Sequence, residues 1–410
     1  MRSSPVPNPA AKETPALERA VAQAAHGPFS TLHWTLLLVS LPFGILNFVL
    51  PIYGREVGAS AVEIGMLFSV LSLMMVILRP LVGAGLDRFG RRWFFIAGLT
   101  AYGFSMVGFA YAAEIWGLVI ARVLQGAGAA LLWLATNAIV ADLARSNDRG
   151  RSFGSVLQSA NMGGMIGTFI GFAVLFSQGI ALGWNPLFLG YAMASLLAAV
   201  FAWWRMPETK PGQVDAQTDA LAGLRVVLRS RSLQVMMLVG LISGASSAML
   251  SPILMIYLQD KFQAGISTLA WAFFPSAMVW IFLPSRMGIL ADRFGRKPLI
   301  ILAMLMASVV SIVIPLQGSL LALTVLWVVE AVCFTASDPA GQALITDLAE
   351  ESVRGRVYGV FALAGSLGAV IGPLVGGWLF DTVNQSAPFL INGAALLLSA
   401  VLMWLGLKER

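Results

Sequence analysis

Charged side chains are scarce in this sequence, and so are the residues that most often perform catalysis. Only 11% of the 410 residues are charged, whereas a typical soluble domain has about 25%. There are two histidines, His26 and His33, and one cysteine, Cys333, so no disulfide can form within the chain. The sequence contains no cluster of His, Cys and Asp and no phosphate-binding Gly-Lys-Ser/Thr loop. These absences exclude a soluble domain, give no sign of a cofactor or metal, and argue against an enzyme.

Long apolar runs are abundant instead. Hydrophobic residues make up 58% of the chain, and a helix needs roughly 20 of them in succession to cross a hydrocarbon core of ~30 Å. Twelve such runs predict an all-α membrane protein with twelve transmembrane helices. The runs cover residues 31–53, 61–82, 93–113, 115–141, 152–178, 185–204, 232–258, 267–287, 298–316, 320–346, 356–380 and 387–406.

The segments outside these runs divide the chain. Residues 1–30 are rich in Ala and Pro and lack the apolar core of a signal peptide, so we expect a cytoplasmic tail. Residues 205–231 form the longest interior connection, a linker to which the sequence assigns no chemistry, and 407–410 form a second cytoplasmic tail. Two membrane domains are therefore expected, at 31–204 and 232–406.

The distribution of the basic residues along the chain reflects its membrane topology. The net charge is +6, which in a soluble protein would suggest nucleic acid. However, only Arg55 and Lys261 fall in odd-numbered connections, and Arg122 lies within a span. The other Lys and Arg residues lie in the tails and even-numbered connections or within about one turn of them. By the positive-inside rule both termini are cytoplasmic, and no nucleic-acid partner is expected.

A ten-residue motif occurs twice. Residues 83–92 read GAGLDRFGRR, and residues 288–297, a shift of 205, read GILADRFGRK. A second pair of segments, 142–154 and 347–359, shares Asp, Ala, Arg, Gly, Arg and Gly at the same shift. Two separate motifs at one shift indicate a doubled unit. Each half of the chain is therefore expected to form a bundle of the same topology.

The repeated Gly-x-x-x-Asp-Arg-x-Gly-Arg-Arg/Lys loop resembles the signature loop of the major facilitator superfamily of transporters, and the resemblance extends over about residues 31–406. It implies two pseudo-symmetric six-helix bundles and a secondary active transporter that works by alternating access. The implied partners are a small-molecule substrate, protons and the lipid bilayer. One chain supplies both halves, so a monomer can suffice, and the expected location is a bacterial cytoplasmic membrane.

The two signature loops are expected to form conformational latches when the cytoplasmic side is closed. Their glycines allow tight turns, and the aspartate can accept hydrogen bonds from a nearby helix start. The arginines can pair with an aspartate at the inner end of span four or ten. The alternative is that these residues only enforce topology. The latch residues are Gly83, Asp87, Arg88, Gly90, Arg91, Arg92 and Asp142 in the first half, and Gly288, Asp292, Arg293, Gly295, Arg296, Lys297 and Asp347 in the second.

Span four contains a buried cation. Arg122, Gln125, Trp133 and Thr136 share one helical stripe, and Arg-x-x-Gln-Gly resembles the family's fourth-span motif, whose arginine is associated with proton coupling in drug exporters. An intramembrane arginine is a functional hypothesis by default. The alternative is a structural role, in which Arg122 binds carbonyl groups of a broken helix such as span one.

Span ten holds two acids, Glu330 and Asp338, whose counterparts in span four are Gln125 and Trp133. Helix geometry separates them by ~12 Å along the axis and about 80° in azimuth. A carboxyl group surrounded by apolar side chains favours its protonated form, so either acid could carry a transported proton. The alternatives are a permanent pair with Arg122 or a cap on a helix break at Pro339.

Glycine motifs mark spans five and eleven. Drug exporters of the family often have Gly-x-x-x-Gly-Pro-x-x-Gly-Gly in span five, but this chain has Thr168 for the proline and Phe172 for the last glycine. This departure weakens the choice of an antiporter over a symporter. The full pattern occurs in span eleven, where small residues four apart predict close helix packing. It comprises Gly368, Gly372, Pro373, Gly376 and Gly377.

The substrate cavity is expected where polar residues interrupt the spans. Span one is expected to be kinked or broken, because Pro42 and Pro51 flank Gly44. Small residues in span seven and 18 methionines overall suit an adaptable, mostly apolar wall. The candidate cavity residues are Asn47, Gln125, Trp133, Asn137, Gln158, Asn161, Ser247, Tyr257 and Gln342.

The function expected from these features is proton-coupled export of amphipathic or lipophilic organic molecules, as in multidrug antiporters. A first alternative is proton-linked transport of a specific metabolite, a lipid or an organic anion, the anion being held by Arg122. A remote alternative is a membrane receptor or scaffold without transport, although a scaffold has no evident need for two latches.

Overall fold

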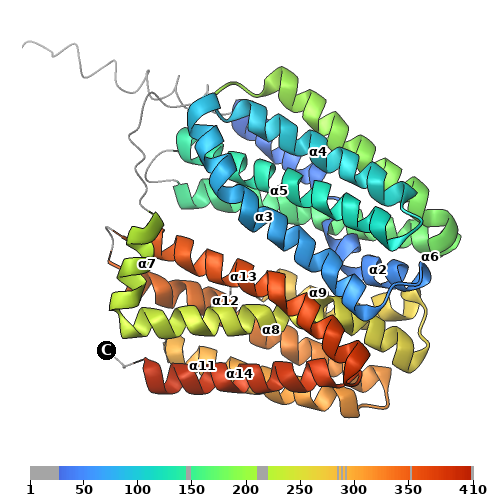
Figure 1. Cartoon of the computed structure of the whole chain (residues 1–410), viewed down its shortest axis with the longest axis vertical. Helices are drawn as coiled ribbons and strands as arrows, with labels where there is room; N and C mark the ends of the chain where they lie inside the picture. Colours follow the sequence, from blue (N-terminus) through green and yellow to red (C-terminus); the bar gives the residue numbers. More distant parts are fainter. Residues whose placement is uncertain are drawn as a thin grey trace, which may run out of the picture.

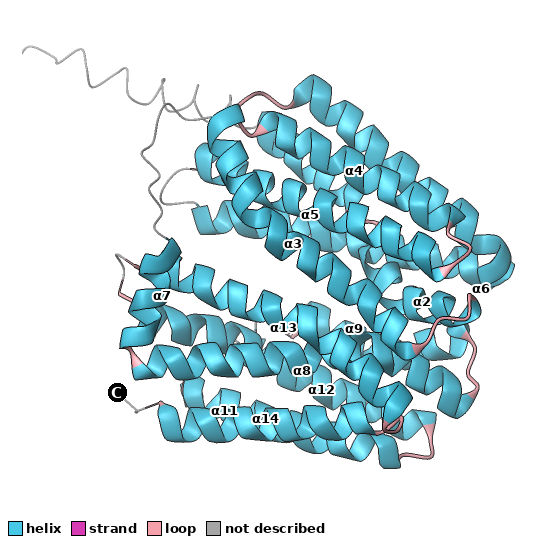
Figure 2. Ribbon diagram, in the orientation of Figure 1, coloured by secondary structure: helices cyan, strands magenta, loops and turns pink. Residues whose placement is uncertain are grey.

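The computed structural model describes residues 27–144, 149–209, 220–283, 286, 287, 290, 293–350 and 353–407. Within these ranges the chain forms helices joined by short connections, without strands (Figure 2). The helices are residues 27–39, α2 (Pro42–Glu56), α3 (Ala61–Phe89), α4 (Arg92–Tyr111), α5 (Ile115–Leu143), α6 (Arg149–Arg205), α7 (Ala220–Arg229), α8 (Arg231–Phe262), α9 (Ile266–Phe282), α11 (Arg296–Val313), α12 (Leu320–Leu348), α13 (Arg354–Thr382) and α14 (Ala387–Gly406).

Twelve membrane spans can be assigned to these helices. Nine of these helices are long and apolar enough to cross a bilayer, and so is the segment Gly27–Glu56, which joins residues 27–39 to α2. Helix α9 is a shorter apolar helix at the place of span eight. The long helix α6 contains both span five and span six, which join at Gly179, where φ is +73°. The predicted fold class, an all-α membrane protein of twelve spans, is therefore confirmed.

The spans form two bundles (Figure 1). Residues 27–205 make the first bundle, blue to green in the figure, and residues 231–406 make the second, yellow to red. Helices α3 and α13 lie side by side where the bundles meet. In the figure they converge at the right and separate toward the left, where the C-terminus and α7 also lie. We call the left-hand end, which carries the first signature loop, the basic end.

Local sequence explains where the helices begin and break. The first span is broken, as its prolines predict: the helix of residues 27–39 ends in a turn, and α2 begins at Pro42. Ser60 starts α3 through a capping box, in which it accepts a hydrogen bond from the backbone N–H of Glu63 and the Glu63 carboxylate accepts one from the N–H of Ser60.

Glycines set the closest helix contacts inside each bundle. A Cβ atom on Gly167 would lie 1.9 Å from the carbonyl oxygen of Leu41, and one on Gly372 would lie 2.1 Å from the carbonyl oxygen of Ala245. Gly372 is 205 residues after Gly167, so the two halves use the same close approach of span five to span one and of span eleven to span seven.

Candidate functional site

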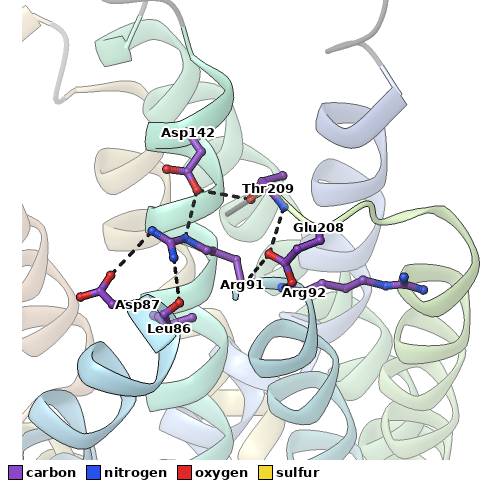
Figure 3. A network of polar contacts seen from close by, with 7 residues as sticks. All are labelled: Leu86, Asp87, Arg91, Arg92, Asp142, Glu208 and Thr209. Carbon is purple, nitrogen blue, oxygen red and sulfur yellow. Dashed lines mark hydrogen bonds and ion pairs between the residues drawn. The ribbon is translucent and has the colours of Figure 1, made fainter. Parts of the chain in front are cut away.

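Arg91 connects three elements at the first signature loop (Figure 3). Its Nε donates to Asp142 of α5 at 3.1 Å, and its Nη1 donates to the carbonyl oxygen of Leu86 at 2.7 Å. Asp87 lies 3.7 Å from Arg91, but 62% of its side chain is exposed. Of the three arginines proposed to pair with Asp142, Arg91 does so. Arg92 instead donates to the carbonyl oxygen of Trp203 at 2.6 Å.

A glutamate that the sequence analysis missed completes this network. Glu208, in the linker, accepts hydrogen bonds from the backbone N–H groups of Arg91 at 2.7 Å and Arg92 at 3.3 Å, at the start of α4. A carboxylate at a helix start is favoured by the helix dipole. Gly90 adopts φ +92°, and a side chain there would collide with Glu208. The linker, to which no chemistry had been assigned, therefore helps to hold the signature loop.

The second signature loop repeats part of this arrangement. Arg296 forms an ion pair with Asp347 and donates to the carbonyl oxygen of Ala343 at 2.9 Å. These residues are the counterparts of Arg91 and Asp142. Gly295 has φ +91°, nearly the value of Gly90, and Lys297 donates to the carbonyl oxygen of Leu407 at 2.6 Å. The predicted latch residues Gly288 and Asp292 lie outside the described residues.

Two further latch arginines lie against neighbouring aromatic rings. Arg88 lies with its guanidinium carbon 5.2 Å from the ring of Phe89, and Arg293 lies 5.6 Å from the ring of Phe294. A side chain at Gly83 would meet open space, so no close helix approach requires this glycine.

Contacts between the two bundles occur at the end opposite the basic end. Arg55, at the end of α2, donates to Asp260, near the end of α8, at 3.1 Å. Asp381 of α13 accepts hydrogen bonds from the backbone N–H groups of Ala61 at 3.3 Å and Val62 at 2.9 Å, the first residues of α3. The helix dipole adds to this capping interaction. These three hydrogen bonds link one bundle to the other.

Small residues let α3 and α13 touch beside these bonds. A Cβ atom on Gly65 would lie 2.1 Å from the carbonyl oxygen of Pro373, and one on Gly377 would lie 2.4 Å from the carbonyl oxygen of Ala61. Two residues of the predicted glycine motif therefore lie at the junction between the bundles, while Gly368, Gly372 and Gly376 face α8.

An aromatic row crosses the same junction. The ring of Phe48 in α2 lies 5.0 Å from that of Phe172 in α6 and 5.8 Å from that of Phe273 in α9. The ring of Phe273 lies in turn 5.9 Å from that of Trp327 in α12. Both Phe273 and Trp327 line the cavity described next, so this row covers the end of the cavity that faces away from the basic end.

A cavity of about 660 Å³ lies in the second bundle. Its described lining residues come from α8, α9, α11, α12, α13 and α14 and from Ile314. The wall is mostly apolar, with serines of α8 and aromatic rings of α9 and α12. The volume lies in the range of sites that hold drug-sized molecules.

Four of the predicted residues lie on the wall of this cavity. They are Glu330, Asp338, Ser247 and Gln342. Asp338 is exposed and accepts a hydrogen bond from Gln342 at 3.3 Å. Glu330 is partly buried, and within the described part of the chain no hydrogen bond or ion pair engages its carboxyl group. Cys333 is the other titratable side chain among the described lining residues.

Arg122 is separate from these acids. It is 2% exposed, and its Nη1 donates to Gln125 at 2.7 Å, while Gln125 donates to the hydroxyl oxygen of Tyr102 at 2.8 Å. Its guanidinium carbon lies 4.9 Å from the ring centre of Phe68 and 5.6 Å from that of Phe109. The suggested pair of Arg122 with Glu330 or Asp338 is therefore not formed in this structure.

Two predicted cavity residues point elsewhere. Gln125 is 3% exposed and occupied by the bonds just described. Tyr257 is also 3% exposed, lies with its ring 4.7 Å from that of Phe389, and accepts a hydrogen bond from Lys261. Both polar side chains form hydrogen bonds inside their own bundles. Neither residue is among the described lining residues of this cavity.

The other candidates belong to the first bundle, whereas all described lining residues belong to the second. Trp133 is partly buried, with its ring 6.3 Å from that of Phe43. Four polar side chains are exposed on the first bundle, where they stay candidates for substrate contact. They are Asn47, Asn137, Gln158 and Asn161.

The chain matches the family model of the Major Facilitator Superfamily over residues 32–286 and 236–410. It belongs to this family. The chain is 25% identical over 386 residues to the multidrug resistance protein MdtG of Escherichia coli O9:H4 (strain HS), an alignment that covers 91% of this chain and 92% of that protein. The MdtG protein of Escherichia coli strain K12 / DH10B is 26% identical over the same lengths.

Solved structures show the same fold. A bacterial homolog of the human lysosomal transporter Spinster, in an inward-facing and occupied conformation, superimposes with a TM-score of 0.77 at 17% identity and covers 92% of this chain and 96% of that one. The nucleoside transporter NupG gives a TM-score of 0.74 at 14% identity and covers 93% of this chain and 99% of that one. This family member is thus a multi-pass membrane transporter.

Proposed function

We propose that this protein exports amphipathic or lipophilic small organic molecules in exchange for protons. The observation that carries the proposal is the cavity of about 660 Å³ whose mostly apolar wall holds two carboxyl groups, Glu330 and Asp338. An apolar wall suits lipophilic molecules, and a few polar groups orient them. The similarity to multidrug resistance proteins over most of both chains supports the same substrate class.

The exchange proceeds by alternating access. The contacts of Arg55, Asp381 and Phe48 hold the bundles together at one end, and they must break before that end can open. The signature loops then act as latches when the basic ends approach each other. Asp87 is the residue best placed for a new contact, because 62% of its side chain is exposed.

Protons bind at the acids of α12. Glu330 has no basic partner among the described residues, so its carboxyl group can alternate between a proton and a substrate without breaking an ion pair. A proton taken up from the acidic side would release the substrate there, and its loss on the other side would restore the carboxylate. Arg122 does not contact these acids, and it influences proton coupling through its hydrogen bonds with Gln125 and Tyr102 in the first bundle.

The orientation follows from the basic residues. The positive-inside rule places the basic end and both termini in the cytoplasm, and the bacterial relatives favour the cytoplasmic membrane. A single chain provides both bundles and the whole described cavity, so a monomer suffices.

Transport in proteoliposomes tests the proposal. The purified protein is reconstituted, and a panel of lipophilic cations, neutral dyes and organic anions is followed under a pH gradient of either sign. The expected result is movement of several unrelated lipophilic compounds opposite to the flow of protons. If none of them moves, or if a single organic anion moves with the protons, broad proton-driven export is wrong.

A further inference from the structure

The described wall of the cavity carries charge of one sign. Glu330 and Asp338 are its charged side chains, and no Lys, Arg or His occurs among the lining residues that the structure describes. The one deeply buried cation of the membrane region that the structure describes, Arg122, belongs to the first bundle and is directed at Gln125. An organic anion in this cavity would face two carboxyl groups without a compensating base, whereas an organic cation would be attracted.

Aromatic rings flank Glu330 on both sides. Trp327 precedes it by three residues and Phe334 follows it by four on α12, so the helix places the two rings about one turn away in each direction on the same face. The ring of Trp327 lies 5.9 Å from that of Phe273, and the ring of Phe334 lies 5.0 Å from that of Trp280. All four rings line the cavity. The faces of such rings attract cations.

Trp327 adds an unused hydrogen-bond donor. Its side chain is 3% exposed, and its indole Nε1 has no hydrogen-bond partner among the described residues. A buried donor without an acceptor is costly unless a ligand supplies one. Trp327 stands one turn before Glu330 on α12, so both residues belong to the same part of the cavity wall.

We propose that Glu330, with the ring pairs Trp327–Phe273 and Phe334–Trp280, forms a subsite for the positively charged group of an aromatic organic cation. This assignment rests on the proposed transport function and narrows it from lipophilic molecules in general to amphipathic cations. It also argues against the alternative substrate class, an organic anion held by Arg122. The part of the wall that α8 contributes, with its apolar side chains and small serines, would hold the remainder of the molecule.

Binding at equilibrium, without any gradient, tests the subsite. The full-length protein in detergent is given radiolabelled tetraphenylphosphonium, and displacement is measured with unlabelled tetraphenylphosphonium, neutral triphenylphosphine oxide and anionic tetraphenylborate. The two tetraphenyl ions have nearly the same shape and opposite charge. We expect the cation to bind at least about tenfold more tightly than the neutral compound and the anion to be weakest, because one charge-assisted contact corresponds to about that ratio.

The decisive variant is Glu330→Gln, which removes the charge and keeps the shape. It should weaken the cation about tenfold or more and leave the neutral compound unchanged, which also shows that the site remains folded. Glu114→Gln, which makes the same charge change at an exposed position at the start of α5, should change neither. Equal loss of both ligands in Glu330→Gln, or binding of tetraphenylborate as tight as that of the cation, overturns the subsite.

The two proposals fail separately. A cation that binds through Glu330 but is not moved in proteoliposomes would contradict the proposed export and leave the subsite standing. Proton-driven movement of neutral compounds with no preference for the cation in the binding assay would support export and contradict the subsite.

Discussion

Arg55 and Asp260 occupy equivalent positions in the two halves of the chain and pair with each other. They are 205 residues apart, the shift that relates the two signature motifs, and their side chains meet at 3.1 Å. Equivalent positions of two related bundles can touch only close to the pseudo-twofold axis. Since opposite charges stand at these positions, the pair joins the bundles at the centre of the end that is closed in this structure.

Breaking this pair should favour opening of that end. Both side chains are about one-third exposed, so the pair is expected to stabilise the closed arrangement by only ~0.2–1 kcal/mol. Arg55→Ala should therefore shift the ratio of closed to open molecules by up to about fivefold. Spin labels at the exposed residues Tyr111 and Leu316 would report it as a longer distance, in a background in which Cys333 is replaced by serine.

Because the two positions are equivalent, exchanging their charges should restore the interaction. Arg55→Asp should open the end further, because two acids would then face each other, and the double variant Arg55→Asp, Asp260→Arg should restore the closed distance. If the double variant behaves like Arg55→Asp alone, the attraction between these two residues does not hold the bundles together.

Asp87→Asn should have the opposite effect. If the signature loop is a latch at the basic end, the variant weakens the conformation in which that end is closed, so the basic ends spend more time apart and transport slows. Spin labels at the exposed residues Trp204 and Phe294 would show the longer distance more often. Unchanged distances together with an unchanged transport rate would show that Asp87 only enforces topology.

Gly372→Ala should destabilise the second bundle. Its new methyl group would lie 2.1 Å from the carbonyl oxygen of Ala245, so α13 must move away from α8, and overpacking of this kind costs about 1–3 kcal/mol. The matched control is Gly365→Ala on the same helix, where a side chain would meet open space. Thermal unfolding in detergent should show a lower midpoint for the first variant and little change for the second. Equal midpoints would contradict the packing role.

Arg122→Met should stabilise the protein and impair its function. The guanidinium group is buried, and its described partners, Gln125 and the rings of Phe68 and Phe109, are neutral. Replacing such a buried charge with an apolar side chain of similar length often raises stability by ~1–4 kcal/mol. A higher unfolding midpoint together with slower proton-coupled transport is expected. A lower midpoint would indicate that Arg122 is a structural link.

The sequence predicted those features that depend on the repeat and on local chemistry. The shift of 205 placed Arg296 and Asp347 where Arg91 and Asp142 stand in the first half, and the structure has an ion pair at both places. Pro42 predicted the break in the first span, which the structure contains. Each of these predictions depends only on residues close together in one helix or on the equivalent residues of the repeat.

Contacts between distant helix ends escaped the sequence analysis. Asp381 caps α3 across 319 and 320 residues of chain, and Glu208 reaches back to Arg91 from the linker. No periodicity indicates such partners. The pair of Arg55 and Asp260 could have been found, because the repeat shift applied to Arg55 leads directly to Asp260.

The wall of the cavity was only partly predictable for a similar reason. A helical stripe tells which side chains share a face, but not which neighbouring helix covers that face. Gln125 and Glu330 are equivalent by the repeat, yet the first is enclosed by Tyr102 and Arg122 and the second lines the cavity. The packing around each position decides the outcome, and this packing is visible only in the folded structure.

Proton movement driven by the substrate tests the central claim most directly. Weakly buffered proteoliposomes that contain a pH-sensitive dye are prepared without a gradient, and tetraphenylphosphonium is added on one side. Exchange through Glu330 and Asp338 predicts that protons move toward the side of addition as the cation moves away from it, and that the double variant Glu330→Gln, Asp338→Asn abolishes this movement. Protons that move in the same direction as the cation, or an unchanged signal in the double variant, would contradict the account.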